Sequence, residues 1–551
     1  MNDFDVVISG AGPVGLVLAI DLGRRGVRTL LVEKDATTKR FPKMDRSNAR
    51  TMEMFRRLGL ADQVRALGYP EHASMDVFIV TRLVDEPLLR LRYPTVAEHR
   101  AAIAACTDAS EPLEPYQLVS QNDLEPMLKE VAEATPNVTV RFGCALASFM
   151  QDAEGVDVHL ERIDGTGERS RASYLVGCDG ATSLVRKSLG IALQGKGNLR
   201  SLRQVTFRSE TLYERLPHGQ GRHYYFADDG GGAIVVQGSR KEFTMNVALP
   251  EDADLERAVR DRVGFDFDFH ITATTSWKHH LLLAERYRDR RVFIAGDAAH
   301  LMIPTGGLGM NTGVGDAIDL AWKLAGTVQG WGGSGLLESY EFERRKVGAR
   351  NVEAAGWAAA GVGMWRSLWR PHVGSNTPEG EQLRAEIAQT ANLHHRRVHE
   401  MFGVELGYSY AGSPLIATEP GDRGEWDTST YTPHTRPGVR LPHVWLKDGR
   451  AMQDVLGTDY TLLDVVGQLD ANEAIAVREP FQRLGVPIKI VRLDEPHVRE
   501  LLGFDLLLMR PDLHVFWRGN ALPGDLDFLA NAAAGALHAD AVRGADPVVY
   551  P

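Results

Sequence analysis

Short apolar runs and amphipathic stretches alternate along the first part of the chain. Val6-Val7-Ile8 and residues 29–32 are wholly apolar, as is typical of strands buried on both faces of a parallel sheet. The segment between them fits a helix that reaches about Arg25, because Arg24 and Arg25 suit its negative C-terminal end and Gly26 suits the cap. The pattern predicts a βαβ unit.

Later segments mix helical and strand-like patterns. Helices are expected near residues 50–58 and 122–134, with strands alternating from 138 to 176 and predominating from 203 to 277. The apolar run 292–295 predicts another buried strand, followed by Gly-rich sequence and a long helix from about Gly313. The C-terminal part is predicted to hold strands at 461–466, 488–491, 506–509 and 515–517 and a last helix near 528–537.

The composition is that of a folded protein with several domains. At about 150 residues per domain, a chain of 551 residues suggests three or four units. Hydrophobic residues at 44% and charged residues at 25% exclude a largely disordered chain. The net charge of −11 gives no electrostatic reason to expect a nucleic-acid partner.

Cysteine content and apolar runs bear on location. Cys106, Cys144 and Cys178 are too few and too far apart for a disulfide framework or a zinc site. The charge-free run 354–365 is too short and too Gly-rich to span a bilayer, and the first residues lack the positive region of a signal peptide. We therefore expect a cytoplasmic protein with no membrane partner and no bound metal.

The first chemical motif is the turn Gly10-Ala11-Gly12-Pro13-Val14-Gly15, between the first strand and the first helix. Gly10 permits the tight turn, Gly12 lets the backbone approach a pyrophosphate, and Gly15 lets the helix pack closely on the sheet. Glu33 ends the next strand 18 residues after Gly15, where its carboxylate can accept hydrogen bonds from a ribose. The combination predicts a site for an adenine dinucleotide and leaves open whether this is FAD or NAD.

Two more motifs follow strands. Asp179-Gly180 is a common kind of turn, equally compatible with plain structure and with a site. In the segment 291–311 Asp297 follows the end of a buried strand, and a Gly-rich loop then leads into a helix. Free N–H groups and the positive helix end would favour an anion in front of residues 309–311, such as the N1/O2 edge of a reduced flavin. The alternative is a phosphate site or a tight glycine packing loop.

In this order and at these separations the three motifs resemble those of the FAD-dependent aromatic hydroxylases, the single-component flavoprotein monooxygenases, and in particular their phenol-hydroxylase branch. The resemblance covers essentially the whole chain. It implies an α/β (α+β) fold, in which a Rossmann-like FAD-binding domain is interleaved with a β-sheet substrate domain and followed by a thioredoxin-like domain.

The domain boundaries expected from this resemblance are discontinuous. They are 1–75, 120–190 and 280–375 for the FAD-binding domain, 76–119 and 191–279 for the substrate-binding domain, 376–433 for a helical segment and linker, and 434–551 for the thioredoxin-like domain. No cysteine follows Cys178, so the last domain cannot run dithiol chemistry, and packing or contact within a homodimer is its expected role.

The resemblance also implies which residues contact FAD. They are Gly10, Gly12, Pro13, Val14, Gly15, Glu33, Lys34, Lys43, Arg46, Gln121, Asp179, Gly180, Gly296, Asp297, Pro304, Gly307, Gly309, Met310 and Asn311. Within this set Gln121 matches a glutamine beside the flavin, and Lys43 falls where other relatives carry an arginine near the pyrophosphate.

Asp45 and Pro304 are the catalytic residues that the resemblance implies. Asp45 occupies the position of an aspartate thought to accept the proton of a phenol, and Pro304 would sit close to the reacting flavin edge. Relatives often have Gly where this chain has Arg46, and a neighbouring cation weakens a carboxylate as a base. The alternative for Asp45 is a surface acid paired with Arg46 or Lys43. His300 is expected to be a packed, hydrogen-bonded structural residue.

The substrate site is less defined. His223, Tyr225, Trp277 and His279 lie on strands that could form its wall, although aromatic residues at strand spacing usually belong to the core. None of them is assigned a catalytic role.

The resulting function is hydroxylation of a phenolic or other small aromatic substrate with O2 and NADH or NADPH, through a flavin C4a-hydroperoxide. Only one dinucleotide motif is evident, so the nicotinamide nucleotide is expected to bind transiently in a shared cleft. Two alternatives remain open at this stage. One is an FAD-dependent epoxidase or other oxidoreductase on the same scaffold, and the other is a dinucleotide-binding protein without enzymatic activity.

Overall fold

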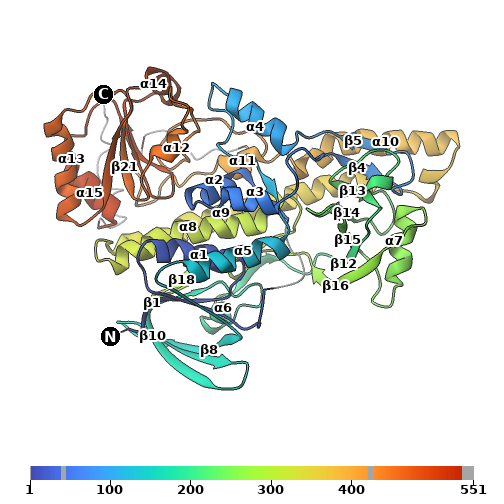
Figure 1. Cartoon of the computed structure of the whole chain (residues 1–551), viewed down its shortest axis with the longest axis horizontal. Coiled ribbons are helices and arrows are strands. Elements are labelled where there is room, and N and C mark those ends of the chain that lie inside the picture. Colours follow the sequence, from blue (N-terminus) through green and yellow to red (C-terminus); the bar gives the residue numbers. More distant parts are fainter. Residues whose placement is uncertain (1, 39–44, 418, 420–426, 537–551) are drawn as a thin grey trace.

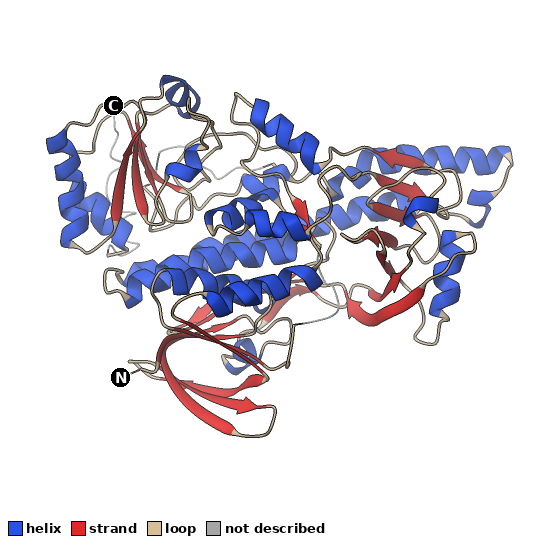
Figure 2. Ribbon diagram, in the orientation of Figure 1, coloured by secondary structure: helices blue, strands red, loops and turns tan. Residues whose placement is uncertain are grey.

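The computed structural model describes residues 2–38, 45–417, 419 and 427–536. Three units are visible in Figure 1: a sheet covered by long helices at the centre and bottom, a second sheet at the right, and the orange-to-red C-terminal unit at the upper left. Figure 2 shows that the helices α1, α5, α8 and α9 form a layer between the first sheet and the C-terminal unit. Among the described residues no helix combines the length and the apolarity needed to cross a bilayer.

The first sheet contains the parallel strands predicted from the apolar runs. Its order is β18 (Arg288–Asp289), β19 (Val292–Ile294), β10 (Gly167–Gly177), β1 (Phe4–Ser9), β2 (Thr29–Glu33) and β7 (Val138–Phe142), with β8 (Cys144–Gln151) and β9 (Val156–Arg162) extending from β10. Val7 pairs with Leu30 on one side and Leu175 on the other, and all three are fully buried. The carboxyl ends of β1, β2 and β19 therefore meet at one edge, which is where a doubly wound sheet binds its ligand.

The helix α1 (Pro13–Arg24) packs closely against α8 (Leu308–Val328). A Cβ on Gly313 would lie 3.0 Å from the Cα of Gly296 and would overlap Val14, so small residues let the Val14 side chain pack between the two segments. The helix predicted to start near Gly313 in fact starts at Leu308. Its N-cap, Gly307, adopts a left-handed φ of 66°, and tertiary packing overrides the low helix propensity of the glycines that follow.

The second sheet has the order β16 (His270–Lys278), β12 (Ser201–Arg208), β15 (Glu242–Val247), β14 (Ala233–Val236), β13 (His223–Phe226), β4 (Val77–Val80) and β5 (Leu89–Leu91). Side chains alternate between its two faces. Tyr224 and Phe226 enter a hydrophobic core that α7 (Leu255–Val263) covers, so His223 and Tyr225 face the other way.

Long helices join the two sheets. The helix α9 (Ser334–Arg366) runs from the first sheet toward the second, and α10 (Pro378–His394) packs back against it. Trp365 and Ile387 belong to the same hydrophobic cluster as the strand residue Ile79, and all three are fully buried. Residues 371–374, in the stretch expected to be a boundary, form a single 3-10 turn between these two helices.

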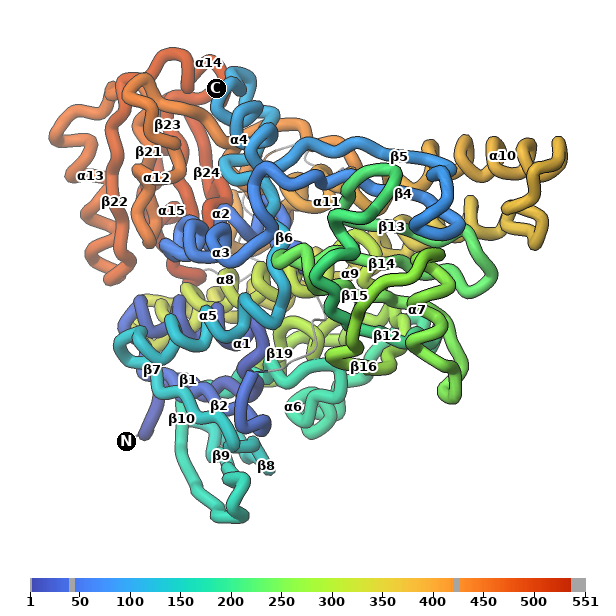
Figure 3. Tube along the Cα trace, turned by 45° about the vertical axis from the view of Figure 1, so that its right-hand side comes forward, coloured from blue at the N-terminus to red at the C-terminus, as the bar shows by residue number. Residues whose placement is uncertain are grey.

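Several short elements complete this part of the chain. They are β3 (Arg46–Ser47), β6 (Gln117–Leu118), α2 (Ala49–Arg57), α3 (Ala61–Leu67), α4 (Val96–Ala105), α5 (Gln121–Ala134), α6 (Leu184–Ser188), β11 (Leu193–Lys196), β17 (Leu281–Ala284), β20 (His300–Leu301) and α11 (Phe402–Leu406). In Figures 1 and 3, α4 lies beside the C-terminal unit, and the Trp445 indole N–H donates to the Ile103 carbonyl at 2.9 Å.

The C-terminal unit has a thioredoxin-like fold. Its sheet has the order β22 (Ile488–Arg492), β21 (Tyr460–Asp464), β23 (Leu506–Met509) and β24 (Val515–Gly519), with β21 parallel to β22 and antiparallel to β23. The helices α13 (Ala471–Arg483), α14 (Pro496–Leu502) and α15 (Leu526–Ala534) complete it, after the short α12 (Met452–Val455). The four predicted strands and the last helix are confirmed to within a few residues.

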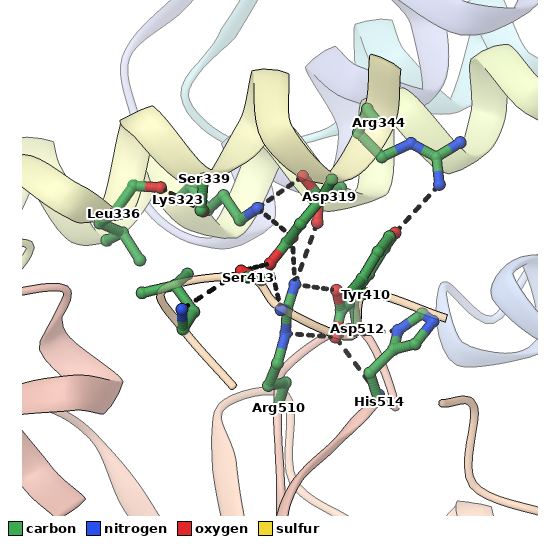
Figure 4. A network of polar contacts seen from close by, with 12 residues as sticks. Asp319, Lys323, Leu336, Ser339, Arg344, Tyr410, Ser413, Arg510, Asp512 and His514 are labelled. Carbon is green, nitrogen blue, oxygen red and sulfur yellow. Dashed lines mark hydrogen bonds and ion pairs between the residues drawn. The ribbon is translucent and has the colours of Figure 1, made fainter. Parts of the chain in front are cut away.

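Buried charges attach this unit to the helix layer (Figure 4). Arg510 donates to Glu343 at 2.6 Å and to Asp512 at 2.7 Å, while Lys323 donates to Asp319 at 2.7 Å and to Glu343 at 2.5 Å. Burial disfavours the charged form of Glu343, but Arg510 and Lys323 overcome this and hold its pKa at about 2. We refer to these five residues as the docking network.

Candidate active site

A single cavity of about 1840 Å³ runs between the carboxyl edge of the first sheet and the inner face of the second. This exceeds the roughly 300–1,000 Å³ that encloses a drug-sized ligand, so it has room for a large cofactor and a second molecule. Of the residues predicted to contact FAD, Gly15, Gly296 and Asn311 do not line it, Lys43 lies outside the described residues, and all the others do.

The glycines of the first turn fall into two kinds. A Cβ on Gly10 would overlap the Cys178 carbonyl, and one on Gly15 would overlap the Gly10 carbonyl, so both are required by the packing of the protein itself. A Cβ on Gly12 would meet no protein atom closer than Glu125 Oε1 at 4.0 Å and would project into the cavity. Since protein packing does not explain Gly12, a close ligand such as a pyrophosphate at the α1 N-terminus does.

Glu33 stands at the end of β2, beside this turn. Its carboxylate accepts the Ala11 N–H at 2.8 Å and the Asp35 N–H at 3.1 Å. The side chain is half-buried and lines the cavity together with Lys34, which leaves it accessible to ribose hydroxyls. Glu33 therefore both fixes the Gly-rich turn and lies where a ribose acceptor is expected.

A second helix N-terminus opens into the same cavity. No side chain caps α8, so the backbone N–H groups of its first turn, residues 308–311, are available to an anion. A Cβ on Gly309 would meet no protein atom within 4 Å. Pro304 and Asp297 are exposed to the cavity, and Asp297 makes no hydrogen bond or ion pair with the described residues. The loop offers donors and a carboxylate that the protein itself does not use.

Two predicted contact residues have structural roles that the sequence did not reveal. The Asn311 side chain accepts the Asn48 N–H at 2.9 Å and donates to the carbonyls of Arg46 at 2.9 Å and Gly307 at 2.5 Å, which fixes the segment around β3 against α8. The Asp179 carboxylate, although it lines the cavity, caps α6 by accepting the Ser183 hydroxyl at 2.5 Å and the Leu184 N–H at 2.7 Å.

His300 is confirmed as a structural residue. It is fully buried, and its Nε2 lies 2.9 Å from an Asp316 carboxylate oxygen that also accepts the Gly296 N–H at 3.1 Å. Burial opposes ionisation of Asp316, but Arg344, at 2.8 Å, and His300 hold its pKa below the usual range. Through the Gly296 N–H, these charged residues fix the Gly296-Asp297 turn in place.

Asp45 lies in the cavity, and its partner is Arg222. The Arg222 Nη2 forms an ion pair with the Asp45 carboxylate, so the pairing of Asp45 with Arg46 is wrong, while Lys43, the other partner considered, lies outside the described residues. Arg46 instead pairs with the buried Glu405 at 2.7 Å and lies over the Tyr116 ring at 5.0 Å. The Asp45 side chain keeps 26% of its surface exposed, whereas that of Arg222 keeps 2%, so the cavity can reach the carboxylate.

Comparison with known families decides what such a cavity belongs to. A family model described as FAD binding domain matches residues 3–355, and one described as Aromatic-ring hydroxylase, C-terminal matches residues 434–539. The chain belongs to the FAD-dependent aromatic-ring hydroxylases. It is an FAD-dependent monooxygenase, and both alternatives, an FAD-dependent epoxidase or other oxidoreductase and a non-enzymatic dinucleotide-binding protein, are set aside.

Individual relatives extend over nearly the whole hydroxylase. It is 33% identical to aklavinone 12-hydroxylase RdmE of Streptomyces purpurascens, over 95% of this chain and 97% of the relative. It is 30% identical to 2,4-dichlorophenol 6-monooxygenase of Cupriavidus pinatubonensis, over 95% and 94%. The solved structure of the rebeccamycin biosynthetic enzyme RebC with reduced flavin superposes with a TM-score of 0.87 at 32% identity, covering 97% of this chain and 99% of that chain.

The second sheet gives the hydroxylase cavity a wall of polar and aromatic side chains. Strand registers place one row across its inner face: Thr275, Gln204, Asn246, Ala233 and Tyr225. His223, Trp277 and His279 line the cavity as well, so the four residues named as a possible wall all face it. For His223 and Tyr225 this follows from strand alternation, because Tyr224 and Phe226 of the same strand enter the hydrophobic core.

Three histidines beside this wall are neutral. The ring centre of His399 lies 5.4 Å from that of His223 and 5.6 Å from that of His395. Burial, reinforced for His223 by Arg222, holds the pKa of each well below the usual range. A cluster of uncharged imidazoles suits contact with an aromatic molecule better than contact with an ion.

Sequence reasoning missed Arg222, Arg200 and Arg366, which all line the cavity. Arg222 precedes β13 and shares parity with the core residues Tyr224 and Phe226, so strand alternation would have placed it in the core. Arg366 comes from the far end of α9, and no local pattern connects it with a strand at residue 200.

Proposed function

We propose that this hydroxylase acts on a phenolic substrate bound between Asp45 and the inner face of the second sheet. Gly12 and the α1 N-terminus would hold the FAD pyrophosphate, Glu33 a ribose, Asp297 the ribityl chain and the α8 N-terminus the electron-rich edge of the flavin. When bound and reduced by NADH or NADPH, FAD would react with O2 so that one oxygen atom reaches the aromatic ring and the other leaves as water. Side chains of the protein would accept the proton, orient the ring and exclude water.

One observation carries the proposal: a carboxylate reaches the cavity beside the α8 N-terminus while a buried arginine holds it in place. Arg46, the neighbour of Asp45, packs on the α8 cap, since a Cβ on Gly307 would lie 3.2 Å from the Arg46 Cδ. The ion pair with Arg222 keeps Asp45 on the sheet side of this contact. A phenol hydroxyl placed against Asp45 could donate its proton to the carboxylate. The resulting phenolate reacts with an electrophilic oxygen more readily than the neutral phenol does.

The wall would then orient the ring and exclude water. Leu202, Val235 and Ala233 give it apolar surface, and the neutral histidines add aromatic surface without charge. Exclusion of water prevents the loss of activated oxygen as hydrogen peroxide. A relative named for 2,4-dichlorophenol supports a phenol as the substrate class.

The nicotinamide nucleotide would use the same cleft for a short time. The sequence holds one dinucleotide motif, at Gly10–Gly15, and FAD accounts for it. Transient sharing requires that nucleotide and substrate do not compete for the whole cavity, which its volume allows.

Location and assembly are parts of the same proposal. Three free cysteines, in a chain where none pairs, support a reducing compartment such as the cytoplasm. A homodimer remains a prediction, with the thioredoxin-like unit as its expected contact.

A direct assay tests the proposal. Purified protein should be yellow and should oxidise NADH or NADPH slowly alone and much faster with members of a panel of phenols, with a hydroxylated product of matching mass. If the flavin is fully bound and no phenol stimulates nucleotide oxidation, the phenol-hydroxylase assignment is wrong.

A further inference from the structure

Two arginines of the cavity have no carboxylate partner among the described residues. Arg200 precedes β12, and Arg366 ends α9, so they come from segments far apart in the chain. A Cβ on Gly231 would lie 3.3 Å from the Arg200 Nη2 and 3.4 Å from the Arg366 Nε, which shows that both guanidinium groups flank the same glycine. The nearby carboxylate of Asp228 pairs with Arg262 at 2.9 Å instead.

The protein satisfies these arginines only in part. Arg200 donates to the Gly230 carbonyl at 2.7 Å and Arg366 to the Gly232 carbonyl at 2.5 Å. The Arg366 Nε is buried and has no hydrogen-bond partner among the described residues. Burial, and then the charge of Arg200, lower the pKa of Arg366 to about 10, as two adjacent cations without an anion require.

Neighbouring aromatic residues add further unused polar atoms. His279 is the backbone partner of Arg200, and its ring lies 4.9 Å from that of Trp277. The Trp277 Nε1 and the His279 Nε2 are buried without a partner within the described part of the chain. Burial, followed by Arg200, lowers the pKa of His279 to about 4, so this imidazole is neutral at pH 7. Buried donors without partners are costly, and a bound acceptor would remove that cost.

We propose that Arg200 and Arg366, with the Trp277 N–H, bind a carboxylate of the aromatic substrate. The inference rests on the proposed function and narrows it from phenols to hydroxylated aromatic acids. The strand β13 connects this subsite with Asp45. Arg222, the partner of Asp45, precedes the strand, and the Gly232 carbonyl that accepts from Arg366 also accepts the N–H of Phe226 at the other end of the strand. One substrate can therefore present its hydroxyl to Asp45 and its carboxylate to the arginines.

The test compares two ligands that differ in one group, 2-naphthol and 6-hydroxy-2-naphthoate, by titration of the FAD-loaded enzyme. We expect the acid to bind at least about tenfold more tightly, since charge-assisted hydrogen bonds are about twice as strong as neutral ones. Arg366→Gln and Arg200→Gln should each weaken binding of the acid by about 10- to 100-fold and leave naphthol within about twofold. Arg366→Lys should restore part of the loss, because it keeps the charge without the planar fork.

Matched controls separate the subsite from loss of folding. Arg203→Gln alters an arginine of β12, three residues after Arg200, that donates to the Pro250 carbonyl at 3.1 Å and does not line the cavity, so it should leave the binding of both ligands unchanged. Trp277→Phe removes only the indole N–H and should weaken the acid by a few-fold.

Three results would overturn the subsite. The first is equal affinity of the wild type for the acid and for naphthol. The second is an equal loss of affinity for both compounds in the arginine variants. The third is a loss of affinity in these variants for NADPH and NADH alone, which would assign the arginines to a nucleotide phosphate. Hydroxylation of naphthol by the wild type keeps the proposed function even then, whereas failure to hydroxylate either compound with FAD bound counts against the function itself.

Discussion

Buried charged side chains are fully paired in the docking network, whereas buried polar groups in the cavity are only partly paired. In the docking network each charged side chain meets an opposite charge: Lys323, Asp319, Glu343, Arg510 and Asp512 are all paired (Figure 4). In the cavity the Arg222 Nε and Nη1, the Arg366 Nε and the Trp277 Nε1 are buried without partners among the described residues.

The difference separates groups that hold the fold together from groups that await a ligand. Leaving a buried donor unpaired costs about 1–3 kcal/mol, and a ligand that accepts from such a donor in the cavity would offset this cost. The glycines divide in the same way, since Gly15 is required by the neighbouring backbone and Gly12 only by a ligand. Substitutions at four places test this distinction: the docking network, Asp45, the Gly-rich turn and the α8 N-terminus.

The largest expected effect lies in the docking network. Arg510→Met would take the arginine away from the buried Asp512 carboxylate and leave Glu343 with Lys323 as its only charged partner among the described residues. It should lower the free energy of unfolding by about 3–5 kcal/mol. Urea denaturation measures this. Arg483→Met, which breaks an exposed pair with Asp527 in the same unit, should cost less than about 1 kcal/mol. Equal costs would show that the network does not secure the unit.

Asp45→Asn tests the cavity carboxylate. A phenol has a pKa near 10, so below that pH it is neutral and needs a base, and above it the substrate ionises by itself. We expect kcat to fall about 100-fold near pH 6–7 and progressively less as the pH approaches 10. A pH profile of hydroxylation measures this.

The matched control for that variant is Asp76→Asn. Asp76 also pairs with an arginine, Arg90 at 2.6 Å, on the same sheet, but it does not line the cavity. It should show no pH-dependent loss. An Asp45→Asn rate that equals the wild-type rate at every pH would remove Asp45 from the reaction.

Gly12→Ala and Gly15→Ala should fail in different ways. Gly12→Ala should weaken FAD binding at least about tenfold and change the stability of the apoprotein by less than about 0.5 kcal/mol, because its methyl group meets only the cofactor. Gly15→Ala should destabilise the apoprotein, because its methyl group overlaps the Gly10 carbonyl. Flavin fluorescence and denaturation of the apoprotein distinguish the two; similar behaviour would refute the distinction.

The smallest effect concerns the α8 N-terminus. Gly309→Asp has room for its side chain and adds a negative charge to the first helical turn. It should lower the flavin reduction potential by about 30 mV, the equivalent of about 1.4 kcal/mol for a two-electron couple. Gly309→Ser is the neutral control. An unchanged potential in the Asp variant would show that the helix end does not stabilise the reduced flavin.

Local patterns predicted most of the fold. A few consecutive residues are enough to indicate the strands buried on both faces, the Gly-rich turn and the strands of the thioredoxin-like unit. The structure contains all of them. The start of α8 was placed five residues late, because glycines suggested a loop where tertiary packing sustains a helix.

The cavity was less predictable because its partners come from distant segments. Asp45 meets Arg222, and Arg200 meets Arg366, across separations that no periodicity encodes. Asn311 and Asp179 show the converse, since the family resemblance implied ligand contacts while both side chains bind the protein's own backbone.

The central claim is that the cavity brings activated oxygen and an aromatic ring together. Turnover of a stimulating phenol under ¹⁸O2, followed by mass spectrometry, tests it most directly. The account predicts one labelled oxygen atom in the product for each NADH or NADPH oxidised. Flavin reduction that yields only labelled hydrogen peroxide, with an unlabelled aromatic for every phenol that stimulates it, would contradict the account.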